Sequence, residues 1–327
     1  MIKRIIERLK IFETRHYEFS ISRIEQLKTW LRFRIQTLMG AHRHFFTFAQ
    51  GADYYVLKPP TGNEPVCENG LPIPPRRLWF GYAETEQRYL EVGRYSINSM
   101  TKDMQATGFP VNDCTRVLDF GCAAGRMIRW LKDIAERGEV WGVDVSADHI
   151  AWCSQNLSPP FNFATTTEIP HLPFEDRYFD FIYAASVFTH IDDLAATWLQ
   201  ELRRILRPGG RLYATIHDEH LVSIIEPDYI KNTLPEIAQK SGQNHWGQIR
   251  LSKRAHAKKF FRQASKSRFN SIVYNRRGNP QAFFNSQYFT KQLAANFKTI
   301  SILPEAQHYQ TAVILERSAK ANSIDRA

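Results

Sequence analysis

The feature that most constrains this chain is a short apolar strand that runs into an acid and a loop of small residues. Residues 115–125 read Thr-Arg-Val-Leu-Asp-Phe-Gly-Cys-Ala-Ala-Gly, so the strand ends at Asp119. A helix is expected directly after the loop, over residues 126–132, and a second strand, 140–143, then ends at Asp144. This order of strand, tight turn, helix and strand is typical of a nucleotide-binding α/β unit. The segment therefore predicts a site for a nucleoside cofactor.

The spacing of small residues in the loop separates two cofactor classes. Dinucleotide enzymes require glycines at relative positions 0, 2 and 5. Those positions hold Gly121, Ala123 and Arg126, so the third glycine is missing. A cofactor without a pyrophosphate, such as S-adenosylmethionine (SAM), requires an acid at the strand end and a G-x-x-x-G loop, which Asp119, Gly121 and Gly125 supply. An ordinary strand-to-helix turn with incidental glycines is the alternative.

Three later motifs add to the loop. They are Leu172-Pro-Phe-Glu-Asp-Arg-Tyr-Phe-Asp180, Ser186-Val-Phe-Thr-His190 and Arg207-Pro-Gly-Gly210. Together with the loop they resemble the class I SAM-dependent methyltransferases of bacterial small-molecule type, whose domains read D-F-G-C-G-x-G-R, L-P-x-x-D-x-x-F-D, S-V-F-T-H and L-R-P-G-G. The resemblance covers residues 116–217 well, and Ala123 departs from the glycine that the family usually has.

The resemblance implies both a fold and a binding site. The expected fold is α/β, a Rossmann-like and mostly parallel sheet whose last strand, near residues 307–315, is antiparallel. The implied cofactor is SAM. Its expected contacts are Asp119, Gly121, Cys122, Ala123 and Gly125 at the methionine end, Asp144 at the ribose, Thr166 beside the adenine, and Ser186 after the fourth strand.

The expected chemistry is displacement at an activated methyl group, and a base assists if the acceptor is a hydroxyl. The candidates are His190, after the fourth strand, and His217 with Asp218, after the fifth. Both strand ends face the crevice where α/β sheets bind ligands. Thr-Ile-His217-Asp218 resembles the family's Thr-Thr-His-Gly segment, which favours His217. A purely structural histidine is the alternative.

Composition shifts along the chain predict its organisation. We expect a helical N-terminal extension over 1–57, a proline-rich linker over 58–78, a catalytic domain over 79–317 with a basic insertion at 219–285, and a tail at 318–327. The net charge of +10 is uneven, because residues 1–43 and 219–290 are basic and residues 44–218 are acidic.

The two basic regions each allow two interpretations. Amphipathic helices expected at 2–12 and 21–39 either pack on protein or contact anionic lipid at a membrane surface. The block at 253–262 either binds an acidic acceptor, such as a nucleotide-linked sugar, a lipid phosphate or a nucleic acid, or forms a solvated helix face.

Several classes of protein are disfavoured by what the sequence lacks. Ser158-Pro-Pro-Phe161 precedes the third strand, the wrong place for a loop that stacks on a target base, which argues against nucleic acid. Four scattered cysteines show no metal-ligand spacing and fit a reducing interior. No apolar run approaches the roughly 20 residues of a spanning helix, so a cytoplasmic location is expected.

The sequence predicts a SAM-dependent methyltransferase that acts on a small-molecule acceptor, with a sugar or glycolipid hydroxyl favoured. A non-catalytic adaptor with a SAM-type fold, working at a membrane or in an assembly, is the alternative. A nicotinamide-dependent oxidoreductase is disfavoured by Arg126 at the third-glycine position. The sequence leaves the oligomeric state open.

Overall fold

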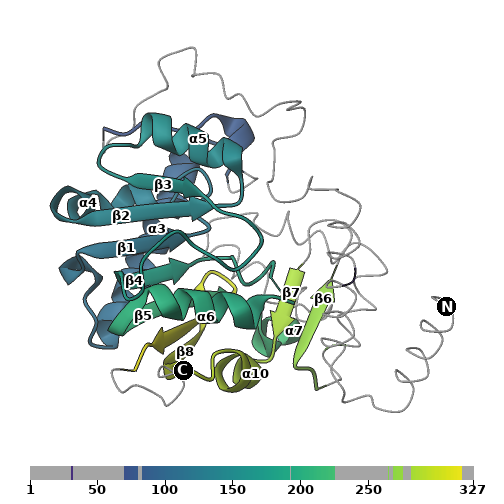
Figure 1. The fold of residues 1–327 in the computed structure, drawn as a ribbon. Helices are drawn as coiled ribbons and strands as arrows, with labels where there is room; N and C mark the ends of the chain where they lie inside the picture. Colours follow the sequence, from purple (N-terminus) through teal and green to yellow (C-terminus); the bar gives the residue numbers. More distant parts are fainter. Residues whose placement is uncertain are drawn as a thin grey trace.

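The computed structural model describes residues 31, 70–79, 83–191, 193–224, 264, 268–274 and 281–318 (Figure 1). Of the helices expected at 2–12 and 21–39, only Leu31, which is helical, lies among these residues. The basic block at 253–262 and the tail beyond residue 318 lie outside them.

One seven-stranded sheet organises the described residues. Its strands are β1 (Arg116–Phe120), β2 (Glu139–Asp144), β3 (Asn162–Thr165), β4 (Phe179–Ala184), β5 (Leu206–Ile216), β8 (Lys298–Gln307) and β9 (Gln310–Glu316). Their order is β3-β2-β1-β4-β5-β9-β8, and β9 is antiparallel to both of its neighbours while the remaining pairs are parallel. The predicted fold class, a mostly parallel sheet with an antiparallel last strand, is confirmed. The strand order reverses between β1 and β4, and open sheets of this kind bind ligands at the carboxyl ends of the strands there.

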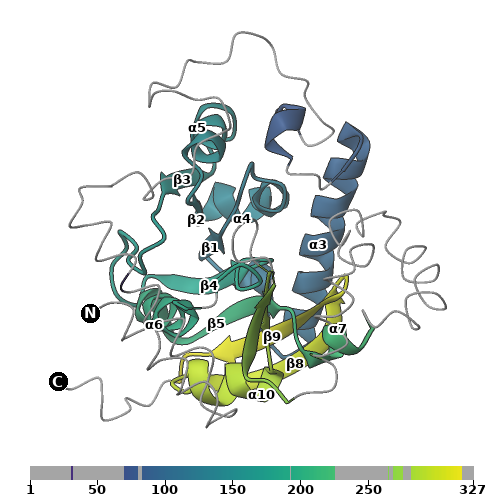
Figure 2. The same cartoon turned by 90° about the vertical axis from the view of Figure 1, so that its right-hand side faces the viewer.

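Helices cover both faces of the sheet (Figures 1 and 2). On one face α3 (Glu86–Ala106), α4 (Lys132–Arg137) and α5 (Ala147–Asn156) contribute to one apolar cluster. On the other face α6 (Ala195–Ile205) and the π-helical turn Phe289–Leu293 contribute to a second. Side chains alternate along β5, so Tyr213 joins the first cluster while Leu212 and Ala214 join the second. Both faces of the central strands are therefore buried.

The segment after the glycine loop differs from the expected helix over 126–132. Residues 123–127 form turns, residues Ile128–Leu131 form a 3-10 turn, and α4 begins only at Lys132. Arg129 is fully buried, and its guanidinium donates to the carbonyls of Leu71, at 3.1 Å, and Pro72. Residues 126–131 thus hold the upstream segment that contains Leu71 and Pro72, and no α-helix begins directly at the loop.

The described end of the proline-rich segment belongs to the folded core. Leu71, Ile73, Leu78 and Trp79 are buried, and the carbonyl of Leu78 lies 3.1 Å from His149 Nε2. A 3-10 turn, Arg76–Leu78, lies within it. The packed region consequently starts before residue 79, where the sequence placed the edge of the catalytic domain.

Parts of the expected insertion at 219–285 pack on the carboxyl ends of the sheet. They are α7 (Glu219–Ile224) and the hairpin of β6 (Ser271–Tyr274) with β7 (Gln281–Phe284). The Ala282 amide donates to the carbonyl of Thr189 at 2.7 Å, and the Phe284 amide donates to that of His217 at 2.8 Å. These bonds fix β7 beside the ends of β4 and β5. A short helix, α10 (Ser286–Tyr288), follows.

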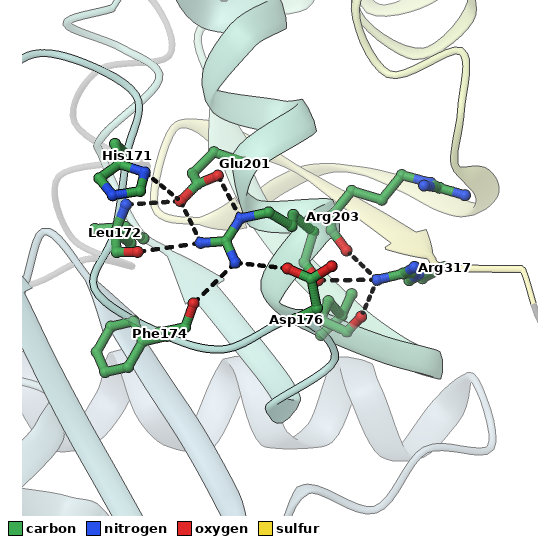
Figure 3. Close-up of polar contacts among 9 residues, drawn as sticks. His171, Leu172, Phe174, Asp176, Glu201, Arg203 and Arg317 are labelled. Atoms are coloured by element: carbon green, nitrogen blue, oxygen red, sulfur yellow. Dashed lines mark hydrogen bonds and ion pairs between the residues drawn. The ribbon is translucent and has the colours of Figure 1, made fainter. Parts of the chain in front are cut away.

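The Leu172-to-Asp180 motif is held by ionic contacts from α6 (Figure 3). The Arg204 guanidinium donates to the carbonyls of Leu172, at 3.1 Å, and Phe174, at 2.8 Å. It also pairs with Asp176 at 2.8 Å and Glu201 at 2.7 Å. These contacts fix the loop that leads into β4, so they position the sheet rather than a ligand.

Among the described helices, none combines the length and apolarity needed to cross a bilayer.

Candidate functional site

The loop after β1 requires glycine at two positions, because of its backbone conformation and because neighbouring side chains pack against it. Gly121 and Gly125 have φ angles of 84° and 75°, in the left-handed region that favours glycine. A Cβ on Gly121 would lie 2.4 Å from Val187 Cγ2, and one on Gly125 would lie 2.5 Å from Leu157 Cδ1. Ala123 shares the left-handed conformation, with φ 46°, which costs an L-residue about 1–2 kcal/mol.

Asp144, at the end of β2, connects this loop to the next turn. Its Oδ2 accepts the Ala123 amide and its Oδ1 accepts the Ser146 amide, both at 2.8 Å. A carboxylate offers about four acceptor positions, so two remain for a ribose diol. Thr166, whose amide donates to the Asp144 carbonyl at 2.9 Å, carries a buried hydroxyl with no partner among the described residues.

Asp119 is a buried acid without a charge partner at hydrogen-bond distance. Its side chain is almost fully buried, and Oδ2 makes no hydrogen bond among the described residues. Burial raises the pKa of Asp119 to about 7, while nearby Tyr183 and Arg126 oppose the rise and Asp144 adds to it. Tyr183 is close enough for this effect, although its hydroxyl reaches no partner with good hydrogen-bond geometry. A bound ammonium group would compensate such a carboxylate.

The thiols beneath the loop are not nucleophiles. Cys122 Sγ and Cys153 Sγ each lie 3.5 Å from the Ala123 carbonyl. Burial raises the pKa of both thiols well above the usual range. Cys122 therefore contributes to the loop by its backbone and by packing.

A cavity lies at the carboxyl ends of β4 and β5, next to the start of β9. Its lining includes Ser96, Ser186, His190, His217, Gln281 and Gln310. No aspartate or glutamate is among its described lining residues, whereas Arg126 is. Because β4 is the direct neighbour of β1, this polar cavity adjoins the crevice that Asp119 and the glycine loop form.

His217 presents an uncharged imidazole to this cavity. It is 4% exposed, and neither ring nitrogen has a hydrogen-bond partner among the described residues. Burial lowers the pKa of His217 to about 3, with a smaller contribution from the charge of His190. The rings of Phe283 and Tyr309 pack around it with centroids at 5.0 and 5.7 Å. The ring is therefore neutral at physiological pH, the form in which one ring nitrogen keeps its lone pair.

Comparison with known proteins agrees with this arrangement. Residues 118–214, from β1 to β5, match the methyltransferase domain family. The chain carries a class I SAM-dependent methyltransferase domain. The cofactor of this domain is SAM. Asp119 Oδ2 and the Thr166 hydroxyl, which have no hydrogen-bond partner among the described residues, fit its ammonium and adenosine groups.

Curated relatives of the methyltransferase domain match this chain over part of their own length. The methyltransferase GfsG of Streptomyces halstedii is 33% identical over 30% of this chain and 36% of its own length. The ubiquinone/menaquinone biosynthesis C-methyltransferase of Neisseria meningitidis is 31% identical over 30% of this chain and 40% of its own. The chain thus spans 36% and 40% of the length of these two relatives.

Solved structures of low sequence identity also align with this chain. A SAM-dependent methyltransferase from Methanosarcina mazei superposes with a TM-score of 0.42 at 16% identity, over 64% of this chain and 94% of that one.

Of the three predicted catalytic residues, the structure brings two together at the cavity and places the third elsewhere. His217 and His190 both line the cavity, and His190 Nδ1 lies 3.4 Å from Gln281 Nε2. Asp218 lies outside the lining: its Oδ2 accepts the Thr311 hydroxyl at 2.6 Å and its Oδ1 accepts the Leu221 amide at 3.1 Å. Asp218 therefore caps α7 and holds it against β9.

Sequence reasoning missed the polar residues that complete the cavity of the methyltransferase domain. They are Ser96, Gln281, Gln307 and Gln310, and Gln307 donates to the Ser96 carbonyl at 2.8 Å. One signal was available, since two glutamines flank the turn before an otherwise apolar last strand. Ser186, predicted as a cofactor contact, lies on the lining of this cavity, with φ 61°.

Proposed function

We propose that the chain transfers the methyl group of SAM to a hydroxyl of an oxygen-rich small molecule, with a sugar or glycolipid as the favoured acceptor. The imidazole of His217 carries this proposal, because it lines a polar cavity beside the cofactor crevice and its ring nitrogens have no hydrogen-bond partner among the described residues. Hydroxyl and amide side chains around it support a polar acceptor. Arg126 in the lining, without an acidic residue there, supports a neutral or acidic acceptor over a cationic one.

The residues of the chain perform three tasks in this reaction. SAM, when bound, supplies a methyl group already activated by its sulfonium. Asp119 pairs with the ammonium and Asp144 binds the ribose hydroxyls, which sets the donor in place over the glycine loop. His217 accepts the proton of the acceptor hydroxyl as its oxygen takes up the methyl group, and alignment in a site shielded from water lowers the barrier further.

The same proposal includes where the enzyme works. The basic segments at 1–43 and 253–262 support an acidic or sugar-linked acceptor and a peripheral contact with anionic membranes from the cytoplasmic side. Nucleic acid is not the proposed acceptor, because Ser158-Pro-Pro-Phe161 forms the turn between α5 and β3, away from the cavity.

Calorimetry with SAM and transfer of a labelled methyl group to a panel of sugars and glycolipids test the proposal. His217→Phe preserves the aromatic packing but removes the base, so we expect transfer to fall by about 10²–10⁴-fold with unchanged SAM affinity. His171→Phe, at an exposed histidine outside the cavity, is the matched control. Normal turnover by the His217 variant would remove the base assignment. No binding at millimolar SAM would contradict the enzyme and favour a non-catalytic adaptor.

A further inference from the structure

The carboxamide of Gln310 has a defined orientation at the cavity. Thr215 Oγ1 accepts the Ser186 amide at 2.7 Å, so its own proton is available to Gln310 Oε1, which lies 2.6 Å away. Ser186 Oγ donates to the same Oε1 at 3.0 Å. Both lone pairs of this oxygen are therefore used, and the flat amide directs its NH2 group the opposite way. Gln310 lines the cavity, and among the described residues its Nε2 donates to no partner.

Gln310 and His217 are neighbours across two strands. The antiparallel register of β5 with β9 pairs Thr215 with Ala312 and Ile216 with Thr311. One further step places His217 opposite Gln310, on the face that Thr215 shares. Side chains at directly opposed positions have Cβ atoms about 4.5–5.5 Å apart. A proton acceptor and an N–H donor consequently line the same cavity.

We propose that Gln310 determines acceptor specificity by donating a hydrogen bond to a second oxygen next to the hydroxyl that His217 deprotonates. The inference rests on the proposed function and adds the class of acceptor: a molecule with oxygens on neighbouring carbons, such as a vicinal diol, a hydroxy ether or a hydroxy ketone. A single isolated hydroxyl satisfies His217 and leaves the amide donor unpaired, which disfavours its binding.

Two size-matched probes test this assignment. 2-Methoxyphenol and 2-ethylphenol differ by an oxygen in place of a methylene, and neither adds a second donor. Their dissociation constants are measured by NMR titration of the full chain saturated with S-adenosylhomocysteine. In Gln310→Glu, one carboxylate oxygen still accepts from Ser186 and Thr215, while the NH2 donor is gone. The wild type should bind 2-methoxyphenol more tightly, relative to 2-ethylphenol, than the variant does. We expect this relative preference, the ratio of the two constants, to fall about fivefold in Gln310→Glu, which corresponds to one neutral hydrogen bond.

Matched variants separate recognition from structure. Gln287→Met, at an exposed glutamine on α10, should leave the ratio unchanged. Gln310→Met also lacks the donor and should show the same shift, with a lower melting temperature because it loses the acceptor for two hydroxyls; it supplies the readout if Gln310→Glu does not fold.

An unchanged ratio in folded Gln310 variants would overturn the assignment and leave Gln310 as a structural support for Ser186. Calorimetry with SAM on the same wild-type protein keeps the two proposals apart. Absent SAM binding contradicts the proposed function, whereas normal SAM binding with an unchanged ratio contradicts only the role of Gln310.

Discussion

Asp119 couples cofactor binding to a proton. Burial raises the pKa of its carboxyl to about 7, so roughly half of the molecules carry the proton at pH 7. A bound ammonium favours the charged carboxylate and lowers this pKa. We expect SAM binding at pH 7 to release roughly half a proton, measured as the difference in calorimetric enthalpy between phosphate and Tris buffers. Asp119→Asn should abolish the release and weaken binding, while the exposed Asp133→Asn should do neither. Equal enthalpies in both buffers would contradict the coupling.

His217 makes the fold sensitive to acid. Its pKa is lowered to about 3 in the folded state and is about 6.5 in the unfolded chain. The unfolded state therefore binds more protons between these values, and stability is lost as pH falls from 6.5 toward 3. From pH 7 to pH 5 this loss is about 2 kcal/mol.

His217→Phe should remove that part of the acid sensitivity, as measured by urea unfolding at pH 7 and pH 5. The difference between wild type and variant is the relevant quantity, because the raised pKa of Asp119 acts in the opposite direction over this range. Exposed His171→Phe is the control. A variant as acid-sensitive as the wild type would mean that His217 is protonated in the folded state.

At the scale of elements, the side chain of Arg317 caps the C-terminal end of α6. Arg317 Nη1 donates to the carbonyls of Arg203, Arg204 and Leu206, at 2.8, 2.9 and 2.8 Å, and Figure 3 shows it at the end of the helix. These are carbonyls that a helix end leaves without intrahelical partners. Arg317→Met should lower the free energy of unfolding by about 1.5–3 kcal/mol, measured by urea titration. The exposed Arg137→Met serves as control, and equal stability of both variants would show that water replaces the guanidinium.

The elements that the sequence predicted well are those whose pattern is local. The apolar run that ends at Asp119 and the glycine spacing are short-range signals, and the mostly parallel sheet with an antiparallel last strand followed from the resemblance to the family's ordered motifs. The helix expected over 126–132 was wrong: residues 123–131 form turns and a 3-10 turn, and Arg129 is buried against the carbonyl of Pro72, 57 residues upstream. The cavity was hidden for the same reason: Ser96, Gln281 and Gln310 meet only in three dimensions.

Across the whole molecule, three consecutive residues after β5 attach α7 to separate elements. Asp218 bonds to Thr311 on β9, Glu219 accepts the Ser286 amide at 2.8 Å, and His220 pairs with Glu305 at 2.8 Å. The point where the insertion leaves the sheet is thereby fixed beside the cavity, as β7 fixes the point where it returns. The cavity is thus lined by residues from distant parts of the chain, all held against the same sheet.

The folded unit extends upstream of residue 79, because residues 70–79 pack into its core. Residues 70–79 bury Leu71, Ile73, Leu78 and Trp79, and burying one such side chain contributes about 1.5–3 kcal/mol. Two chains, one beginning at residue 70 and one at residue 80, differ only in this segment. We expect the shorter chain to lose on the order of 5 kcal/mol or more, which is comparable with the whole stability of a domain. It should also leave the buried Arg129 without the carbonyls of Leu71 and Pro72. Thermal unfolding with circular dichroism measures the difference, and identical melting curves for the two chains would place the edge of the domain at residue 79.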